Sequence, residues 1–149
     1  MTLPSHTGLS LSGFVQFVKD DNLAVLATIS PDYVPEAALM GVAVSDSAVL
    51  IFDAPAGARK LSNIHFNDRV AVVIGWSGGV SIQVEGSVRI VIGDERKHYE
   101  EIYASQFPNS QVSSPSFEVF VVIPSWVRRY DATTEPPKCD FAEWLDDQF

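Results

Sequence analysis

The sequence predicts a mainly β protein, a barrel of antiparallel strands with a few flanking helices, and two observations support this class. About six apolar segments rich in β-branched residues are joined by short turns, which favours antiparallel pairing of successive strands. Only a few segments repeat apolar residues at helical spacing, too few to cover both faces of a doubly wound sheet. We therefore expect a closed or nearly closed β-barrel.

The composition indicates one globular domain with an uneven charge. The chain has 149 residues, of which 46% are hydrophobic and 19% charged, and its formal net charge is −9. Residues 131–149 hold six acidic residues against one lysine, so we expect a barrel domain at residues 1–130, N-terminal helix included, followed by an acidic C-terminal tail. Because nucleic-acid binding needs clustered cations, nucleic acid is not an expected partner.

The sequence does not predict a membrane protein. No apolar run approaches the length that spans a bilayer, and the first residues lack the charged and apolar regions of a signal peptide. We therefore expect a cytoplasmic protein that has no membrane partner.

Each expected element has its own signal. Ser12 is placed to cap a first helix, in which Phe14 and Val18 lie on one apolar stripe. Residues 80–92 alternate between polar and apolar, as in a strand with one solvated face. Residues 94–107 begin with two acids, which stabilise a helix N-terminus. In order, the expected elements are helix 12–20, strands 23–30, 34–45 and 49–52, a short helix opening at residue 59, strands 70–76 and 80–92, helix 94–107, and strands 117–123 and 126–130. Because proline cannot donate a ladder hydrogen bond, we expect Pro35 near a strand start or on an edge, and we expect Pro124 to interrupt the chain between the last two strands.

Two adjacent cations, Arg59 and Lys60, mark the best candidate site. They follow an apolar strand and a proline–glycine turn, and they open a short amphipathic helix. The first N–H groups of a helix have no partner inside the helix and lie at the positive end of its dipole, so cations added there create a site for a phosphate. The plain alternative is a solvated helix face with a weak salt bridge.

Five segments, in their order and spacing, resemble the pyridoxamine 5′-phosphate oxidase-like family, the FMN-binding split barrels. The segments are Leu-Ala-Thr-Ile-Ser-Pro-Asp at 26–32, Val-Leu-Ile-Phe-Asp at 49–53, Gly-Ala-Arg-Lys-Leu-Ser-Asn-Ile at 57–64, Asn-Asp-Arg-Val-Ala-Val-Val-Ile at 67–74 and Ile-Gln-Val-Glu-Gly-Ser-Val at 82–88. The resemblance covers roughly residues 14–130 and implies a split β-barrel of the FMN-binding type, an antiparallel Greek-key barrel. It also implies a homodimer that holds FMN in the cleft between its subunits, and an FMN-dependent oxidoreductase activity on an unknown small-molecule substrate.

The resemblance also assigns cofactor-binding positions. Arg59 and Lys60, which follow Ala58, match the pair that grips the flavin phosphate. Phe52 and Asp53 match positions beside the ribityl chain and ring, and Met40 and Gly41 match the strand that faces the isoalloxazine. Ser81 or Gln83 matches a polar contact to the ring or phosphate. Arg129 and Tyr130 match a pair that approaches from the other subunit. Because the flavin itself accepts hydride, no protein acid or base is required and we assign no catalytic residue.

The chain departs from the family pattern at several positions. Ala58 stands where the family usually has Ser or Thr, which removes one phosphate hydrogen bond, and Ala54 stands in place of a Thr. The second strand has Glu36 and apolar residues instead of a basic residue, and residues 131–135 lack the family's Arg/His substrate motif. Flavin binding is therefore expected, whereas vitamin B6 phosphate is not expected as the substrate.

Two other functions fit parts of the sequence. One is a non-catalytic protein of the same fold that binds FMN, haem or the deazaflavin F420. The other, less favoured, is a serine hydrolase, because Gly-Trp-Ser-Gly-Gly at 75–79 matches the nucleophile elbow. That motif needs a helix after the serine, whereas a strand is expected here, so a plain hairpin turn is favoured. The three histidines are far apart and unaccompanied by cysteine or glutamate at ligand spacing, so no metal site is expected.

Overall fold

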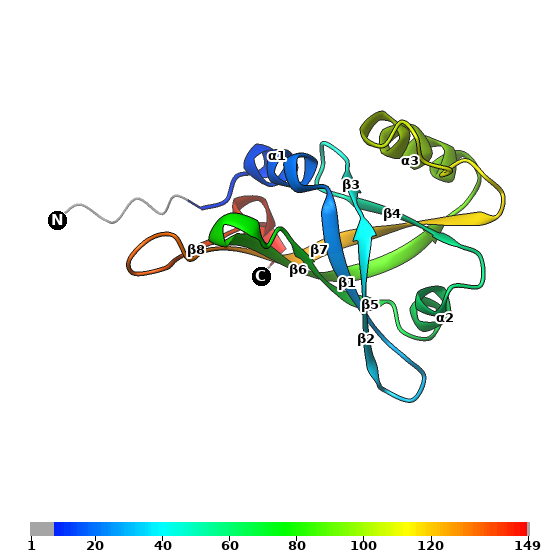
Figure 1. Ribbon diagram of the computed structural model, residues 1–149, viewed down its shortest axis with the longest axis horizontal. Helices are drawn as coiled ribbons and strands as arrows, with labels where there is room; N and C mark the ends of the chain where they lie inside the picture. The colour runs from blue at the N-terminus through cyan, green and yellow to red at the C-terminus, as the bar shows by residue number, and fades with distance from the viewer. Residues whose placement is uncertain (1–7, 149) are drawn as a thin grey trace.

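A single curled antiparallel sheet with three α-helices around it makes up the described part of the chain (Figure 1). The computed structural model describes residues 8–148. None of its helices is long and apolar enough to cross a membrane. The helices are α1 (Leu11–Asp21), α2 (Arg59–Phe66) and α3 (Gly93–Gln106), the strands are β1 (Leu23–Ile29), β2 (Pro35–Gly41), β3 (Ala43–Val44), β4 (Leu50–Pro55), β5 (Arg69–Ile74), β6 (Val80–Val91), β7 (Phe117–Asp131) and β8 (Lys138–Phe141), and the 3₁₀ turns are η1 (Ser77–Gly79) and η2 (Glu143–Gln148).

The strand order makes the sheet curl. The main path runs β2-β1-β5-β6-β7-β4-β3, with antiparallel pairing throughout, and β8 pairs with β7. β2 and β3 lie at opposite ends of this order, yet Val42 alone separates them in the sequence. The two ends of the sheet must therefore come together, and they do so where the Val42 N–H donates to the Asn22 carbonyl at 3.0 Å. The prediction of a mainly β, antiparallel split barrel with flanking helices is confirmed.

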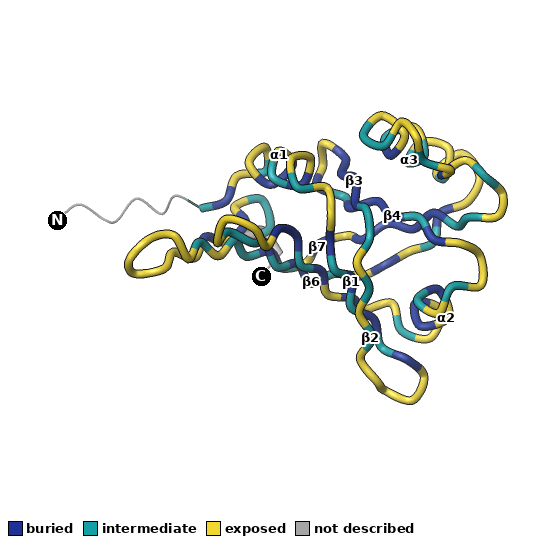
Figure 2. The backbone as a smooth tube through the Cα atoms, viewed as in Figure 1, coloured by how far each residue is buried: buried dark blue, intermediate teal, exposed yellow. Residues whose placement is uncertain are grey.

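The concave side of the sheet holds the main core. Phe52 on β4 and Phe120 on β7 lie opposite each other, are fully buried and stack with 5.4 Å between their ring centroids. α1 adds Phe14 and Val18 to this cluster. A smaller cluster that includes Tyr103 joins α3 to the other face of β3, β4 and β7. In Figure 2 the strands beside α1 and α3 are largely dark blue and teal, whereas the solvent sides of the helices are yellow.

The first two expected boundaries differ from the structure, one for a local reason and one because the sheet closes. Ser10, not Ser12, is the N-cap of α1, because the Ser10 hydroxyl accepts from the Gly13 N–H at 3.0 Å. The expected strand 34–45 is two strands, since the chain bends at Val42 to pass from one end of the sheet to the other. Pro35 begins the edge strand β2, as expected, where its missing N–H costs no central ladder bond.

The expected interruption at Pro124 was wrong. β7 is continuous from residue 117 to residue 131, because the pairing register with β6 shifts between Glu85 and Gly86. Gly86 is the residue opposite Pro124, and a Cβ atom on it would lie 2.4 Å from the Ile123 carbonyl oxygen. The close approach of the two strands at this bulge therefore requires glycine.

The C-terminal segment packs onto the sheet and onto α1. Residues 138–141 form β8 against residues 128–131 of β7. The Trp144 ring lies 5.2 Å from that of Phe14, and Leu145 also contacts the main core. Phe141 is 52% exposed and meets the Trp126 ring edge to face at 6.1 Å. Trp144 and Leu145 thus pack on the barrel, while Phe141 lies on its surface.

Candidate functional site

The two predicted cations lie at the mouth of a pocket between α2 and the edge of the sheet. Arg59 and Lys60 are the first two residues of α2, and they line a cavity of about 360 Å³ together with Leu26, Thr28 and residues 35–38. Ala58 is the N-cap and gives no side-chain hydrogen bond, so the first N–H groups of α2 have no side-chain partner there. The pocket therefore combines two cationic side chains with the positive end of a helix, which suits an anionic group.

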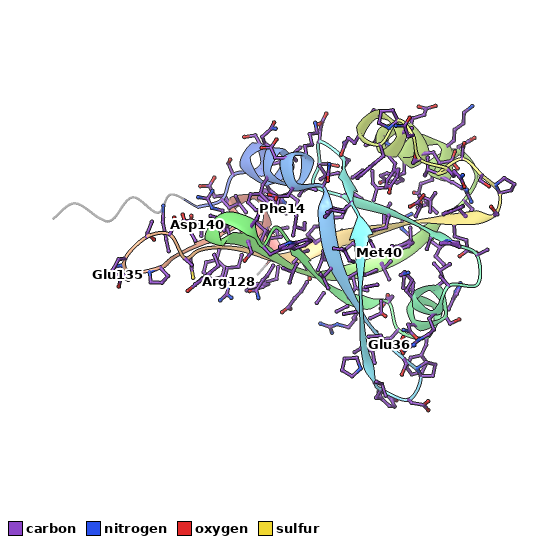
Figure 3. All side chains as sticks on the ribbon, viewed as in Figure 1. Phe14, Glu36, Met40, Arg128, Glu135 and Asp140 are labelled. Atoms are coloured by element: carbon purple, nitrogen blue, oxygen red, sulfur yellow. The ribbon has the colours of Figure 1, made fainter. Side chains whose placement is uncertain are left out.

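A carboxylate already faces these cations. Arg59 donates through Nε to Glu36 Oε1 at 2.8 Å, and its Nη2 lies 2.7 Å from Glu36 Oε2, so the contact is bidentate. Asn63 Nδ2 donates to the same Glu36 Oε1 at 2.9 Å and to the buried Thr28 hydroxyl at 3.0 Å. Figure 3 shows Glu36 on β2 beside α2. Glu36 thus connects the edge strand to the first two turns of the helix.

Local geometry explains why these groups meet. Thr28 and Glu36 are direct partners in the β1–β2 ladder, so their side chains point to the same face of the sheet. Arg59 and Asn63 are four residues apart on α2 and therefore lie on one face of the helix. The helix face and the sheet face come together over the pocket.

The electrostatics of the pocket are those of a partly neutralised cation site. The hydrogen bonds from Arg59, and then from Asn63, hold the pKa of the Glu36 carboxyl below its usual range, so it is ionised at neutral pH. The Glu36 side chain is 18% exposed, whereas that of Arg59 is 79% exposed and closes over it from the solvent side. Among residues 8–148, Lys60 forms no ion pair, so it is the cation of this pocket that stays uncompensated.

A second polar group lies between β4 and α3. The Tyr103 hydroxyl donates to Asp53 Oδ1 at 3.2 Å. Burial raises the pKa of Asp53, and the tyrosine hydrogen bond partly offsets that rise, while burial and the nearby Asp53 charge raise the pKa of Tyr103. A Cβ atom on Gly41 would lie 3.2 Å from the Tyr103 hydroxyl oxygen and 3.3 Å from the Phe107 ring. The structure therefore brings two predicted positions, Gly41 and Asp53, to the same aromatic residue of α3.

Replacing Tyr103 with phenylalanine is expected to raise the pKa of Asp53 further, because the stabilising hydrogen bond is lost while burial persists. Since the folded-state pKa of Asp53 lies above its unfolded value, the stability from this group is full below the unfolded pKa and falls as pH rises through the folded pKa. The variant extends that loss to higher pH. Carbon-13 NMR titration of the carboxyl carbon measures the shift, and Tyr99→Phe on the same helix is the control. An unchanged or lower Asp53 pKa in Tyr103→Phe would contradict the assigned role.

A third group of predicted residues lies on the convex face of the sheet. Ser81 and Tyr130 are partners in the β6–β7 ladder, and Gln83 is the partner of Arg128, which donates to it through Nη2. Arg128 also lies over the Trp126 ring, with its Cζ atom 5.7 Å from the ring centroid. Figure 3 shows Arg128 well apart from Glu36. Within one chain, the convex-face group is therefore separate from the Arg59–Lys60 pocket, which Glu36 lines.

Arg129 and Tyr130 do not share a face of β7. Arg129 is the ladder partner of the buried Ile82, whereas Tyr130 is the partner of Ser81. Successive residues of a strand point to opposite faces, so a ligand lying on one face of β7 contacts only one of these two side chains. The basic residue on the face of Tyr130 is Arg128, which the sequence analysis did not single out.

Two predicted positions have side chains that face the core. Phe52 is fully buried against Phe120, and Met40 packs against the same cluster. Any contact that Phe52 makes with a ligand would use its backbone. Sequence reasoning also missed Asn63 and Tyr103 as site residues; the i, i+4 spacing of Arg59 and Asn63 was the available signal for the first.

The hydrolase alternative lacks its structural context. Ser77 opens the 3₁₀ turn η1, which connects β5 to β6, so the residue follows a strand but precedes another strand. The hairpin predicted at 77–79 is confirmed.

Among residues 8–148, no group of three or more His, Cys, Asp or Glu residues could hold a metal ion. His6 lies outside the described residues, and the His98 ring packs against Tyr99 on α3.

A curled antiparallel half-barrel with a cationic pocket at the start of α2 defines the class of this protein. The model of the family described as Pyridoxamine 5′-phosphate oxidase matches residues 13–131, which is most of the chain. The chain belongs to this family. No curated protein matches it in sequence.

Solved structures share the fold at low identity. A proposed pyridoxamine 5′-phosphate oxidase from Listeria innocua has a TM-score of 0.67 at 21% identity, over 80% of this chain and 96% of that one. A haem-binding protein from Mycobacterium smegmatis has a TM-score of 0.71 at 14% identity, over 95% and 60% of the two chains. A protein of unknown function from Agrobacterium tumefaciens has a TM-score of 0.68 at 17% identity, over 73% of this chain and 51% of its own, so this chain spans about half of its length.

Proposed function

We propose that this chain binds FMN, with the flavin phosphate held at Arg59 and Lys60, and that it uses the bound flavin as an oxidoreductase. The observation that carries the proposal is the pocket in which these two cations meet the uncapped N-terminus of α2. A phosphate monoester needs several donors and positive charge, and both are available there. Membership of the pyridoxamine 5′-phosphate oxidase family supports a flavin as the phosphate's carrier.

The residues present fit a flavin phosphate in part. Lys60 and the helix N–H groups are free of side-chain partners within the described residues, whereas Arg59 is engaged by Glu36. A ligand phosphate can use the guanidinium N–H groups that face solvent, since Arg59 is 79% exposed. The pocket therefore accepts an anionic group, and Glu36 is the feature that limits the strength of that interaction.

A homodimer would supply the second group of site residues. The convex face of β1, β2 and β5 carries apolar side chains, and in the described part of the chain no helix covers this face. Two of these side chains belong to Leu23, which is 41% exposed, and Leu39, which is 61% exposed. Large exposed apolar faces commonly mark interfaces. We propose that two copies pair through this face, so that Gln83, Arg128 and Tyr130 of one copy approach the Arg59–Lys60 pocket of the other.

The chemistry assigned to the protein is binding and orientation. When bound, FMN supplies the hydride-accepting centre. The chain's own groups would anchor the phosphate at Arg59 and Lys60 and exclude water by joining two apolar sheet faces. No described side chain has to donate or accept a proton in this scheme.

The absorption spectrum of the purified protein after addition of FMN tests this function. We expect a flavin spectrum that stays with the protein through gel filtration and bleaches when reduced nicotinamide is added without air. Retained flavin that resists reduction would favour a non-catalytic binding protein. No retained FMN would contradict the proposal, and the same assay with haem or F420 then identifies the ligand.

A further inference from the structure

Among the described residues that line the pocket, Glu36 is the only acid, so its charge opposes an anionic ligand. Its carboxylate accepts from Arg59 Nε and approaches Arg59 Nη2, which is the paired geometry that guanidinium adopts with carboxylate and with phosphate alike. We propose that Glu36 occupies the position of a ligand oxyanion and thereby sets the charge selectivity of the pocket. This inference rests on the proposed anion site and adds the residue that tunes it.

The contacts of Asn63 show what Glu36 withholds from a ligand. The Asn63 amide has two N–H groups, one donated to Thr28 and one to Glu36. Thr28 is 3% exposed, so this partner keeps Asn63 oriented whether or not Glu36 is present. If Glu36 leaves, one Asn63 N–H and the inner edge of Arg59 become available together. A ligand phosphate would then gain three donors that already converge on one point.

Charge gives the direction of the effect. Glu36 is ionised at neutral pH and lies within hydrogen-bond distance of the donors that a phosphate would use. The Glu36 carboxylate and a ligand anion that share these donors repel each other. This repulsion is stronger for a phosphate dianion than for a singly charged group, and a neutral group does not experience it. With Glu36 in place, the pocket binds a phosphate dianion less tightly than it would without this carboxylate, although Arg59 and Lys60 still attract the phosphate. Loss of the Glu36 charge therefore raises the preference of the pocket for phosphate.

The test replaces Glu36 with glutamine and measures binding of inorganic phosphate. Glutamine is isosteric and keeps one oxygen that can accept from Arg59. We expect phosphate to bind at least about tenfold more tightly to Glu36→Gln than to the wild type, as read from the NMR shifts of the Arg59 Nε–H and Asn63 side-chain resonances. Glu36→Ala is the second variant and is expected to show the same direction, and thermal unfolding reports whether each variant folds.

Glu95→Gln is the matched control. It removes the same charge from another arginine–glutamate pair, Arg89–Glu95, at the start of α3. Phosphate affinity in this control is expected to equal that of the wild type. Unchanged or weaker phosphate binding in Glu36→Gln, or an equal gain in Glu95→Gln, would overturn the inference.

A flavin measurement separates this inference from the proposed function. The ratio of FMN affinity to riboflavin affinity isolates the phosphate, because the two ligands differ only in that group. We expect this ratio to be at least about tenfold higher in Glu36→Gln than in the wild type. If neither protein binds a flavin but inorganic phosphate still binds more tightly to Glu36→Gln, the flavin function fails and the role of Glu36 stands. If FMN binds and the ratio does not change, the flavin function stands and the role of Glu36 fails.

Discussion

Replacing Arg59 and Lys60 together with alanine is expected to weaken FMN binding about a hundredfold, because charge-assisted hydrogen bonds to a phosphate are among the strong ones. The variant also leaves the Glu36 carboxylate in the pocket without its arginine partner, which adds repulsion toward the ligand. Both side chains lie at the surface end of α2, and neither belongs to the core, so the fold is expected to persist. Quenching of flavin fluorescence measures the affinity.

Riboflavin and a second variant provide the controls for this result. Riboflavin lacks the phosphate and is expected to bind the wild type and the double variant with similar affinity. Lys19→Ala/Lys97→Ala removes the same net charge at exposed positions on α1 and α3 and should leave FMN affinity unchanged. Equal affinity of FMN for the wild type and Arg59→Ala/Lys60→Ala would remove the assignment of the phosphate site.

Replacing Val73 with aspartate is expected to break the proposed dimer into monomers and to abolish FMN binding with it. Val73 lies on β5 between Val25 of β1 and Gln83 of β6, in the middle of the convex face. In a two-fold symmetric interface, each of the two copies contributes the substituted residue. Association would therefore bury two unpaired carboxylates. We therefore expect association to weaken by more than about a hundredfold, as measured by light scattering during gel filtration.

The matching control places the same charge on a different surface. Ala104→Asp lies on the exposed side of α3 and is expected to remain dimeric and to bind FMN. Circular dichroism should show an unchanged sheet in both variants, because both side chains point away from the main core. A monomeric wild-type protein, or a Val73→Asp variant that stays dimeric with bound FMN, would contradict the proposed interface.

The sequence predicts the elements of this fold that depend on local signals. The helical spacing of Phe14 and Val18 and the alternation along β6 are properties of neighbouring residues, and the structure confirms both elements within one or two residues. Pro124 misled the prediction because its tolerance depends on Gly86, a partner 38 positions away in the chain. The break at Val42 likewise follows from the closure of the sheet, which no local pattern records.

The candidate site was predictable where its residues are adjacent and not where they meet through space. Arg59 and Lys60 stand out because they open a helix after a turn. Glu36 comes from a strand 23 residues earlier, and its contact with Arg59 depends on how α2 packs against β1 and β2. The choice between Arg128 and Arg129 depends on the register shift in β6 and β7, which sets the face on which each side chain lies.

A crystal structure of the protein grown with FMN tests the phosphate site directly. We expect a dimer in which the flavin phosphate accepts hydrogen bonds from Lys60 and Arg59 at the start of α2, with the ring between the two copies. Flavin bound elsewhere, or a phosphate that makes no contact with either cation, would contradict it.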